Sequence, residues 1–308
     1  MESMISHCTG SSITAGEATS ALAAEIERRL RATAELALPL EEELAILAQL
    51  QEFELGRFLL HNQGLNGYWT SYIFRYRPGD PTATPMEHWL LNNSTLRGIR
   101  ERFHRFKAEI AQYVTDAAVL ASVPCGVMDD LLQQNYRATT GVRLVGVDID
   151  TEAVRLAREN AVQHGLDGQC EFLLRDAWQL GLASEFDLLV SNGLNIYEPD
   201  RARLVELYRT FGRALRPGGR LLVSFPPPPP PPPWLAPERA AEWDKYGIPK
   251  ADLRRNMALF GDIIQAKYRN FTSEQDMRAQ LAEAGLEVEA VSYSATGVMP
   301  IVSAVRPD

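Results

Sequence analysis

Apolar residues recur at helical spacing along the first third of the chain. Leu22, Ile26 and Leu30 lie four positions apart, so they share one face of an expected helix. The same spacing recurs twice more, the last time over about residues 94–113. Residues 1–115 therefore predict an all-helical N-terminal cap ahead of a region of different character.

Short apolar runs alternate with helical patterns after Asp116, which is typical of βαβ units around a parallel sheet. Strands are expected at about residues 119–123, 142–147, 170–174, 186–191, 220–225, 286–293 and 299–305. The last two are expected to pair with each other. The sequence therefore predicts an α/β domain over residues 116–308, with a mostly parallel seven-stranded sheet.

Residues 226–233 are eight consecutive prolines, which offer no backbone N–H to a helix or a sheet. Such a tract adopts a polyproline II helix of about 25 Å, at roughly 3.1 Å per residue. We favour a stiff connector over the carboxyl edge of the sheet, and a ligand for a proline-recognising domain is the alternative. With the helical pattern that follows, the tract is assigned to an insertion over residues 226–270.

The charge of the chain narrows the classes of partner. Its formal net charge is −9, and nucleic acids and anionic membranes bind through a net basic surface, so neither is expected as a partner. The helix over 94–113 carries basic residues that predict a solvated face rather than a nucleic-acid groove: Arg97, Arg100, Arg102, Arg105 and Lys107. The oligomeric state is left open.

Three cysteines and five histidines set further bounds. Cys8, Cys125 and Cys170 are too scattered for a disulfide framework and predict reduced thiols. No histidine pair has the spacing of a metal site, so no metal is expected. The N-terminus lacks the basic and apolar segments of a signal peptide, and a cytoplasmic location is expected.

Polar features follow the first two expected strands. The turn after the first strand contains Gly126, which permits close approach of a ligand to the backbone ahead of a helix N-terminus. Asp148 lies 22 positions later, at the end of the second strand, where an acidic residue can accept hydrogen bonds from ribose hydroxyls. Both features indicate a nucleotide-like ligand at the carboxyl edge of the sheet.

Two further features follow the next strands. Asp176 and Ala177 come after the third strand, where they can hydrogen-bond an adenine ring, and Trp178 can pack near that ring. The fourth strand ends in three small or polar residues, Ser191, Asn192 and Gly193. Ligands in open α/β sheets bind at the carboxyl ends of the strands, so we expect these residues to line the same site.

In this order and spacing, the features resemble the class I S-adenosylmethionine-dependent methyltransferases over about residues 116–306. VGVDIDTEAVRLARENAVQHGL and FLLRDAW are similar to the family's second and third motifs, FDLLVSNG to its fourth strand and ALRPGGRLLVSF to its fifth. The resemblance implies a Rossmann-like fold with helices on both faces of the sheet, and methyl transfer from S-adenosylmethionine with S-adenosylhomocysteine as product. It also implies a set of cofactor-binding residues: Ser122, Pro124, Cys125, Gly126, Asp148, Ile149, Asp176, Ala177, Trp178, Ser191, Asn192 and Gly193.

By position, Asp148 would bind the ribose, Asp176 the adenine, and the turn over 122–128 the methionine moiety. That turn departs from the family's pattern of an acidic residue and alternating glycines, because it reads SVPCGVM and keeps only the middle glycine. Ser122 stands at the acidic position, and Met128 adds bulk at the last glycine position. The change either weakens cofactor binding or marks an atypical subgroup that binds normally, and we expect normal binding.

The methyl acceptor is expected to be a small molecule, attacked through an oxygen, nitrogen or carbon nucleophile and enclosed by the helical cap. Six residues are candidates for its pocket: Tyr68, Trp69, Tyr72, Asn195, Tyr197 and Trp234. The sequence identifies no catalytic base. One alternative is a cofactor-binding protein with a cyclase-type or regulatory role, and another is an interaction protein that works through the proline tract. A nicotinamide-dependent oxidoreductase would need a G-x-G-x-x-G turn, which residues 122–130 lack.

Overall fold

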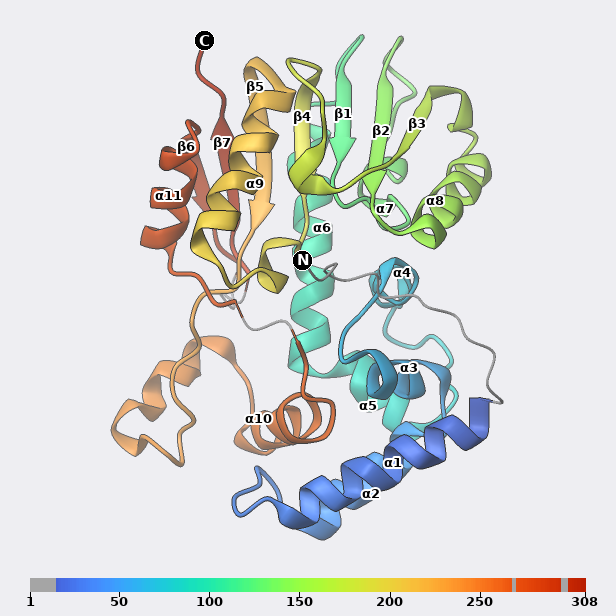
Figure 1. Cartoon of the computed structure of the whole chain (residues 1–308), viewed down its shortest axis with the longest axis vertical. Coiled ribbons are helices and arrows are strands. Elements are labelled where there is room, and N and C mark those ends of the chain that lie inside the picture. Colours follow the sequence, from blue (N-terminus) through green and yellow to red (C-terminus); the bar gives the residue numbers. More distant parts are fainter. Residues whose placement is uncertain (1–14, 268–269, 295–298) are drawn as a thin grey trace. The chain divides into compact units, whose positions relative to one another are not determined.

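The computed structural model describes residues 15–267, 270–294 and 299–308. The chain divides into two compact units, each built from two stretches of sequence (Figure 1). We call the first the helical unit; it contains the described residues up to Ile99 together with residues 230–267. We call the second the sheet unit; it contains residues 100–229 and the described residues from 270 onward.

A seven-stranded sheet forms the centre of the sheet unit (Figure 1). Its strands are β1 (Val119–Ser122), β2 (Arg143–Asp148), β3 (Cys170–Leu174), β4 (Phe186–Ser191), β5 (Leu215–Ser224), β6 (Glu287–Ser292) and β7 (Ile301–Val305). They lie in the order β3-β2-β1-β4-β5-β7-β6; the first five are parallel, and β7 is antiparallel to both β5 and β6. The predicted α/β fold with a Rossmann-like, mostly parallel seven-stranded sheet is confirmed.

Helices cover both faces of this sheet, because adjacent residues of a strand point to opposite sides. Leu189 belongs to a buried cluster that includes residues of α9 (Arg201–Ala214) and α11 (Glu274–Glu283). Its neighbour Leu188 belongs to a second cluster, with α6 (Ser94–Ala111), α7 (Asp129–Leu132) and α8 (Thr151–His164). Short 3₁₀ segments lie between these elements: η1 (Asp167–Gln169), η2 (Ala177–Gln179) and η3 (Asn195–Tyr197). Burial on both faces explains why the central strands are continuously apolar.

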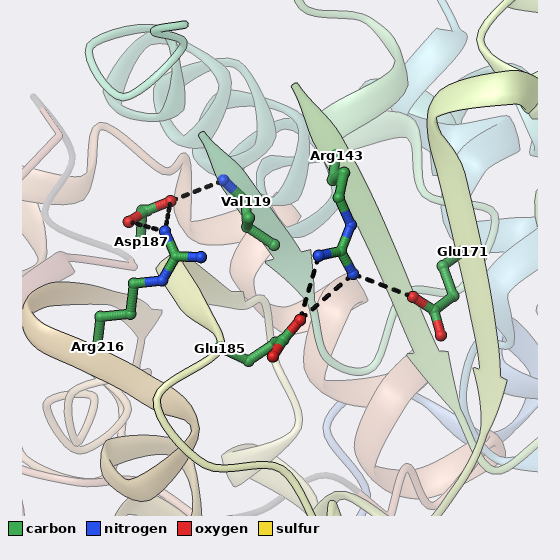
Figure 2. A network of polar contacts seen from close by, with 6 residues as sticks. All are labelled: Val119, Arg143, Glu171, Glu185, Asp187 and Arg216. Atoms are coloured by element: carbon green, nitrogen blue, oxygen red, sulfur yellow. Dashed lines mark hydrogen bonds and ion pairs between the residues drawn. The ribbon is translucent and has the colours of Figure 1, made fainter. Parts of the chain in front are cut away.

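Charged side chains link the strands at their amino ends (Figure 2). Both carboxylate oxygens of Asp187 accept hydrogen bonds from Arg216, at 2.8 and 2.9 Å, and one also accepts the backbone N–H of Val119 at 2.8 Å. Arg143 pairs with two nearby glutamates at 3.3 Å. The Asp187 group satisfies a backbone donor at the start of β1, whereas the Arg143 pairs are half exposed and contribute little.

The helical unit has an apolar core of its own. Its elements are α1 (Ala15–Ala32), α2 (Leu40–Leu50), α3 (Glu54–Asn62), α4 (Gly67–Arg75), α5 (Pro85–Asn92), the start of α6, the 3₁₀ segment η4 (Pro237–Tyr246), α10 (Lys250–Met257) and the π-helical segment η5 (Ala258–Ile263). Leu50 and Ile73 from the N-terminal helices share one buried cluster with Leu259 and Ile263 from η5. A membrane-spanning segment is not found among the described helices.

Two boundaries differ from the predicted domains, 1–115 and 116–308. Residues 230–267 pack with the N-terminal helices rather than with the sheet, because η5 is part of the core of the helical unit. The later part of α6 belongs to the sheet unit, because Phe106 and Ile110 pack against the strands. The proline tract therefore carries the chain from the sheet unit to the helical unit.

Candidate functional site

The turn after β1 is held by left-handed backbone and by short hydrogen bonds. Gly126 has a φ of 51° and Met128 a φ of 62°. The N–H of Met128 donates to the carbonyl of Cys125 at 2.7 Å, and the N–H of Cys125 donates to the carbonyl of Val147 in β2 at 2.8 Å. The turn also contains a cis peptide bond before Pro124. These contacts attach the turn to the carboxyl end of the neighbouring strand.

The bulk that Met128 adds to the turn lies in the core and does not fill the space at the sheet edge. Its side chain is fully buried in the cluster formed by α6, α7 and α8, and a Cβ atom on Gly146 would lie 3.1 Å from its sulfur. Cys125 is buried as well, and burial raises the pKa of its thiol well above the ordinary value, so it is a neutral packing group. Cys170 is also a free thiol, and Cys8 lies outside the described residues.

Asp148 connects the end of β2 with this turn. One of its carboxylate oxygens accepts the N–H of Gly126 at 2.9 Å, and the other accepts the N–H of Asp150 at 3.0 Å. Burial raises the pKa of Asp148, and the two backbone N–H groups oppose that shift. Each carboxylate oxygen has a second lone pair, so both can still accept a hydroxyl donor. Ile149, the next residue, is 48% exposed and adds an apolar surface at the same edge.

A buried carboxylate at the start of α7, that of Asp130, lies on the other side of the turn. The hydroxyl of Ser122 donates to Asp130 at 2.8 Å, and the second oxygen of Asp130 accepts the N–H of Leu131 at 2.9 Å. Burial raises the pKa of Asp130 to about 6, although the two hydrogen bonds lower it. From the sequence, Asp129 and Asp130 are expected to stabilise the N-terminus of this helix and could face the positively charged sulfonium of the cofactor. The hydrogen bond to Ser122 could not be read from the sequence.

The residues after β3 form a capped 3₁₀ turn. Asp176 accepts the N–H of Trp178 at 2.9 Å and caps η2, and Ala177 is buried. The indole N–H of Trp178 donates to the carbonyl of Arg203 in α9 at 2.8 Å, and the Arg203 guanidinium lies 5.1 Å from the indole ring centre. The Trp178 ring is therefore fixed against α9. Its expected packing near an adenine ring stays a prediction.

The end of β4 brings together several candidates. Ser191 is buried, and Gly193 adopts a φ of 100°. Asn195 donates to the Tyr208 hydroxyl at 3.1 Å and to the carbonyl of Ser224 at 2.9 Å. The side-chain oxygens Oδ1 of Asn192 and Asn195 are buried without a hydrogen-bond partner among the described residues. Unpaired acceptors of this kind suit an N–H or O–H donor on a ligand.

Two arginines of α6 are buried, contrary to the predicted solvated face. Arg100 and Arg102 are 7% and 6% exposed, so that prediction is wrong for these two residues. Arg102 reaches the end of β4, where a Cβ atom on Gly193 would lie 3.4 Å from its guanidinium. Tyr197 lies near the same guanidinium, which opposes the rise that burial causes in the pKa of the Tyr197 phenol. Helical periodicity alone could not indicate that a basic residue faces the sheet edge.

Four of the six acceptor-pocket candidates lie in the helical unit. Tyr68, Trp69 and Tyr72 lie together on α4. The ring centre of Trp69 is 5.0 Å from that of Tyr68 and 5.3 Å from that of Tyr72. The Tyr72 hydroxyl donates to Glu87 at 3.0 Å, and burial raises the Tyr72 pKa to about 12. The ring centre of Trp234 lies 4.2 Å from the Arg254 guanidinium. No group of side chains suited to a metal ion is found in the described part of the chain.

A comparison with protein families matches residues 122–272 to the family model of a methyltransferase domain. The chain belongs to the S-adenosylmethionine-dependent methyltransferases. The cofactor of this methyltransferase is S-adenosylmethionine, and the matched segment contains the turn after β1 and the ends of β2, β3 and β4. The carboxylate at the end of β2, the adjacent glycine turn and the unpaired acceptors after β4 fit the hydroxyl and ammonium donors of that cofactor.

The methyltransferase is similar in sequence or in fold to several known proteins. The crystal structure of a possible exported protein from Bordetella parapertussis is 36% identical, with a TM-score of 0.87, and the match covers 96% of this chain and 98% of that one. Methyltransferase GfsG from Streptomyces halstedii is 33% identical over 28% of this chain and 30% of its own. Magnesium protoporphyrin IX methyltransferase from Synechocystis, solved with bound S-adenosylhomocysteine, is 16% identical with a TM-score of 0.52, over 78% of this chain and 94% of that one, and is similar in fold. The chain spans less than half the length of the curated relatives it matches.

Proposed function

We propose that this methyltransferase transfers the methyl group of S-adenosylmethionine to a small-molecule acceptor at the carboxyl edge of the sheet. The observation that carries the proposal is the hydrogen bond between Asp148 and the N–H of Gly126. It joins the acidic residue after β2 to the glycine turn after β1, which is the arrangement that nucleotide-like ligands use in open α/β sheets. The net charge of −9 argues against a nucleic-acid acceptor.

In this proposal, the cofactor lies along the ends of four neighbouring strands, β3, β2, β1 and β4. Asp148 accepts the ribose hydroxyls, and Ile149 covers one face of the adenine through its exposed side chain. Asp176 and Ala177 hydrogen-bond the adenine edge. The methionine moiety is held by the turn after β1 and by the segment after β4, through these residues: Ser122, Pro124, Cys125, Gly126, Ser191, Asn192 and Gly193.

The bound cofactor supplies an activated methyl group on a sulfonium. The protein must align the acceptor with that group and exclude water, because the transfer is a displacement that depends on near-attack geometry. The helical unit as the enclosure of the acceptor, with the aromatic residues of α4, stays a prediction. So does the cytoplasmic location.

Calorimetric titration of S-adenosylhomocysteine tests the proposal, with NADH as a control ligand. We expect binding by the wild type and a loss of at least tenfold in affinity for Asp148→Ala, because the ribose loses a charged acceptor. Asp167→Ala, a change to an exposed acidic residue of η1, should leave affinity unchanged. At a hundredfold excess over Kd, the ligand should raise the free energy of unfolding by about 2.7 kcal/mol.

Two results would contradict parts of this proposal. If S-adenosylhomocysteine does not bind, or binds Asp148→Ala equally well, the assigned cofactor residues are wrong. If it binds but incubation with S-adenosylmethionine and a broad set of small acceptors yields no S-adenosylhomocysteine, a cyclase-type or regulatory role is favoured over methyl transfer.

A further inference from the structure

Arg102 on α6 is a buried cation without a counter-charge among the described residues. Its side chain is 6% exposed, its Nε atom has no hydrogen-bond partner, and one Nη atom contacts the sulfur of Met299 at 3.2 Å. Burial lowers the pKa of Arg102 to about 10, and the phenol of Tyr197 opposes this shift. Burying an unpaired guanidinium costs several kcal/mol, so retaining it calls for a compensating partner.

The position of the guanidinium distinguishes it from the residues assigned to the adenine and the ribose. Its neighbours are Gly193 and Tyr197, which follow β4, and Met299, which precedes β7. The strands run in the order β3-β2-β1-β4-β5-β7-β6, so these neighbours lie on the β4–β7 side of β1. The residues assigned to the adenine and ribose follow β3 and β2, on the opposite side. A group bound at Arg102 therefore lies beyond the methionine end of the cofactor, where the acceptor is expected.

Gly193 leaves room beside the guanidinium. A Cβ atom at this position would lie 3.4 Å from Nη1 and 3.8 Å from Nη2, so any larger side chain would crowd both donors. The buried oxygen of Asn192, next in the chain, has no partner among the described residues. Because Asn192 is assigned to the methionine moiety, the guanidinium is the group that remains for a second ligand, and it suits an anionic group.

We propose that Arg102 binds a carboxylate of the methyl acceptor, so that the enzyme acts on small organic acids. This inference rests on the proposed function. A guanidinium presents parallel N–H donors that match the two oxygens of a carboxylate, and the pair is strong where water is excluded. The ligand would then supply the charge that the folded chain lacks at this position. The methionine carboxylate of the cofactor is the other source of the same chemistry, and the test separates the two.

The test compares wild type with Arg102→Met, Arg102→Lys and Arg105→Met. Arg105→Met is the matched control, because Arg105 is on the same helix and donates to Ser292 of β6 at 2.7 Å. Thermal unfolding of each protein is followed with benzoate or acetate, and with the neutral amides benzamide or acetamide, at fixed ionic strength and with and without S-adenosylhomocysteine. Binding of S-adenosylhomocysteine and of 5′-methylthioadenosine, which lacks the amino-acid part, is measured in parallel.

We expect the carboxylates, but not the amides, to raise the Tm of wild type and Arg105→Met. Arg102→Met should lose about tenfold to a hundredfold in carboxylate affinity, and Arg102→Lys should keep part of it. Without ligand, the Tm of Arg102→Met should equal or exceed that of wild type, because an unpaired buried charge is removed. Its affinity for S-adenosylhomocysteine should be unchanged.

Three results would overturn the inference. Equal responses of wild type to acids and amides, or no response to either, would show that no carboxylate site exists. A clear fall in the Tm of ligand-free Arg102→Met would indicate a structural role. Weaker binding of S-adenosylhomocysteine but not of 5′-methylthioadenosine by Arg102→Met would assign the carboxylate to the cofactor instead. The carboxylate arms without S-adenosylhomocysteine remain informative even if the cofactor assignment fails.

Discussion

Ser122 donates a hydrogen bond of 2.8 Å to Asp130, a buried carboxylate eight positions further along the chain. Ser122 stands where the resembled family has an acidic residue at the end of its first strand. The chain therefore returns a carboxylate to this place from the first turn of α7, across the same turn. In this chain the carboxylate beside the turn therefore comes from the helix instead of the strand. This supports the expectation that the turn still binds the cofactor.

Asp130→Asn should change how stability depends on pH. The pKa of Asp130 is raised from 3.8 to about 6, so between these values the native protein keeps a proton that the unfolded chain has lost. The wild type must therefore lose stability relative to Asp130→Asn as pH rises from about 4 through about 6, by up to about 3 kcal/mol. Urea unfolding of both proteins across this range measures the difference. Asp148 is present in both, so its own titration cancels.

A difference that stays constant from pH 4 to 7 would show that Asp130 does not titrate there. Ser122→Ala provides a further check, because it removes a donor that stabilises the ionised carboxylate. The loss of stability with rising pH should then extend to higher pH.

Met128→Gly should destabilise the protein although it restores the glycine of the family's pattern. Glycine would relieve the left-handed φ of 62°, which is worth about 1 kcal/mol. The change also removes a fully buried side chain, which costs about 2–5 kcal/mol. We therefore expect a net loss of about 1–4 kcal/mol by urea unfolding. An increase in stability would mean that backbone strain at this residue outweighs its packing.

Much of the sheet follows from local sequence, and much of the site does not. Apolar runs between turns located the strands, and the spacing of Gly126 and Asp148 anticipated that the two would share a site. Arg102 was not found, because its position on a basic helix resembles a solvated face until the end of β4 is known to lie beside it. The packing of residues 230–267 with the N-terminal helices depends on contacts distant in sequence, which periodicity does not report.

Asp187→Ala should weaken the amino edge of the sheet without affecting the carboxyl edge. The change leaves the N–H of Val119 and the guanidinium of Arg216 without this acceptor, which costs about 1–3 kcal/mol (Figure 2). Arg143→Ala, the control, removes only half-exposed ion pairs and should cost less than about 1 kcal/mol. Urea unfolding and S-adenosylhomocysteine titration check both parts. A fall in ligand affinity for Asp187→Ala would show that the two edges are coupled.

Ile149→Ala and Trp178→Phe should separate the two apolar candidates for contact with adenine. The Trp178 ring is fixed against α9 by its hydrogen bond to the Arg203 carbonyl and by the Arg203 guanidinium. Trp178→Phe should therefore cost about 1 kcal/mol of stability and leave S-adenosylhomocysteine affinity within about threefold.

Ile149 is 48% exposed, so Ile149→Ala should cost little stability. If adenine covers its side chain, the same change should weaken S-adenosylhomocysteine binding by about tenfold, through the loss of about 1–2 kcal/mol of apolar burial. Calorimetry on both variants decides between them, because the opposite pattern would place the adenine against Trp178 and require Arg203 to move away from the ring.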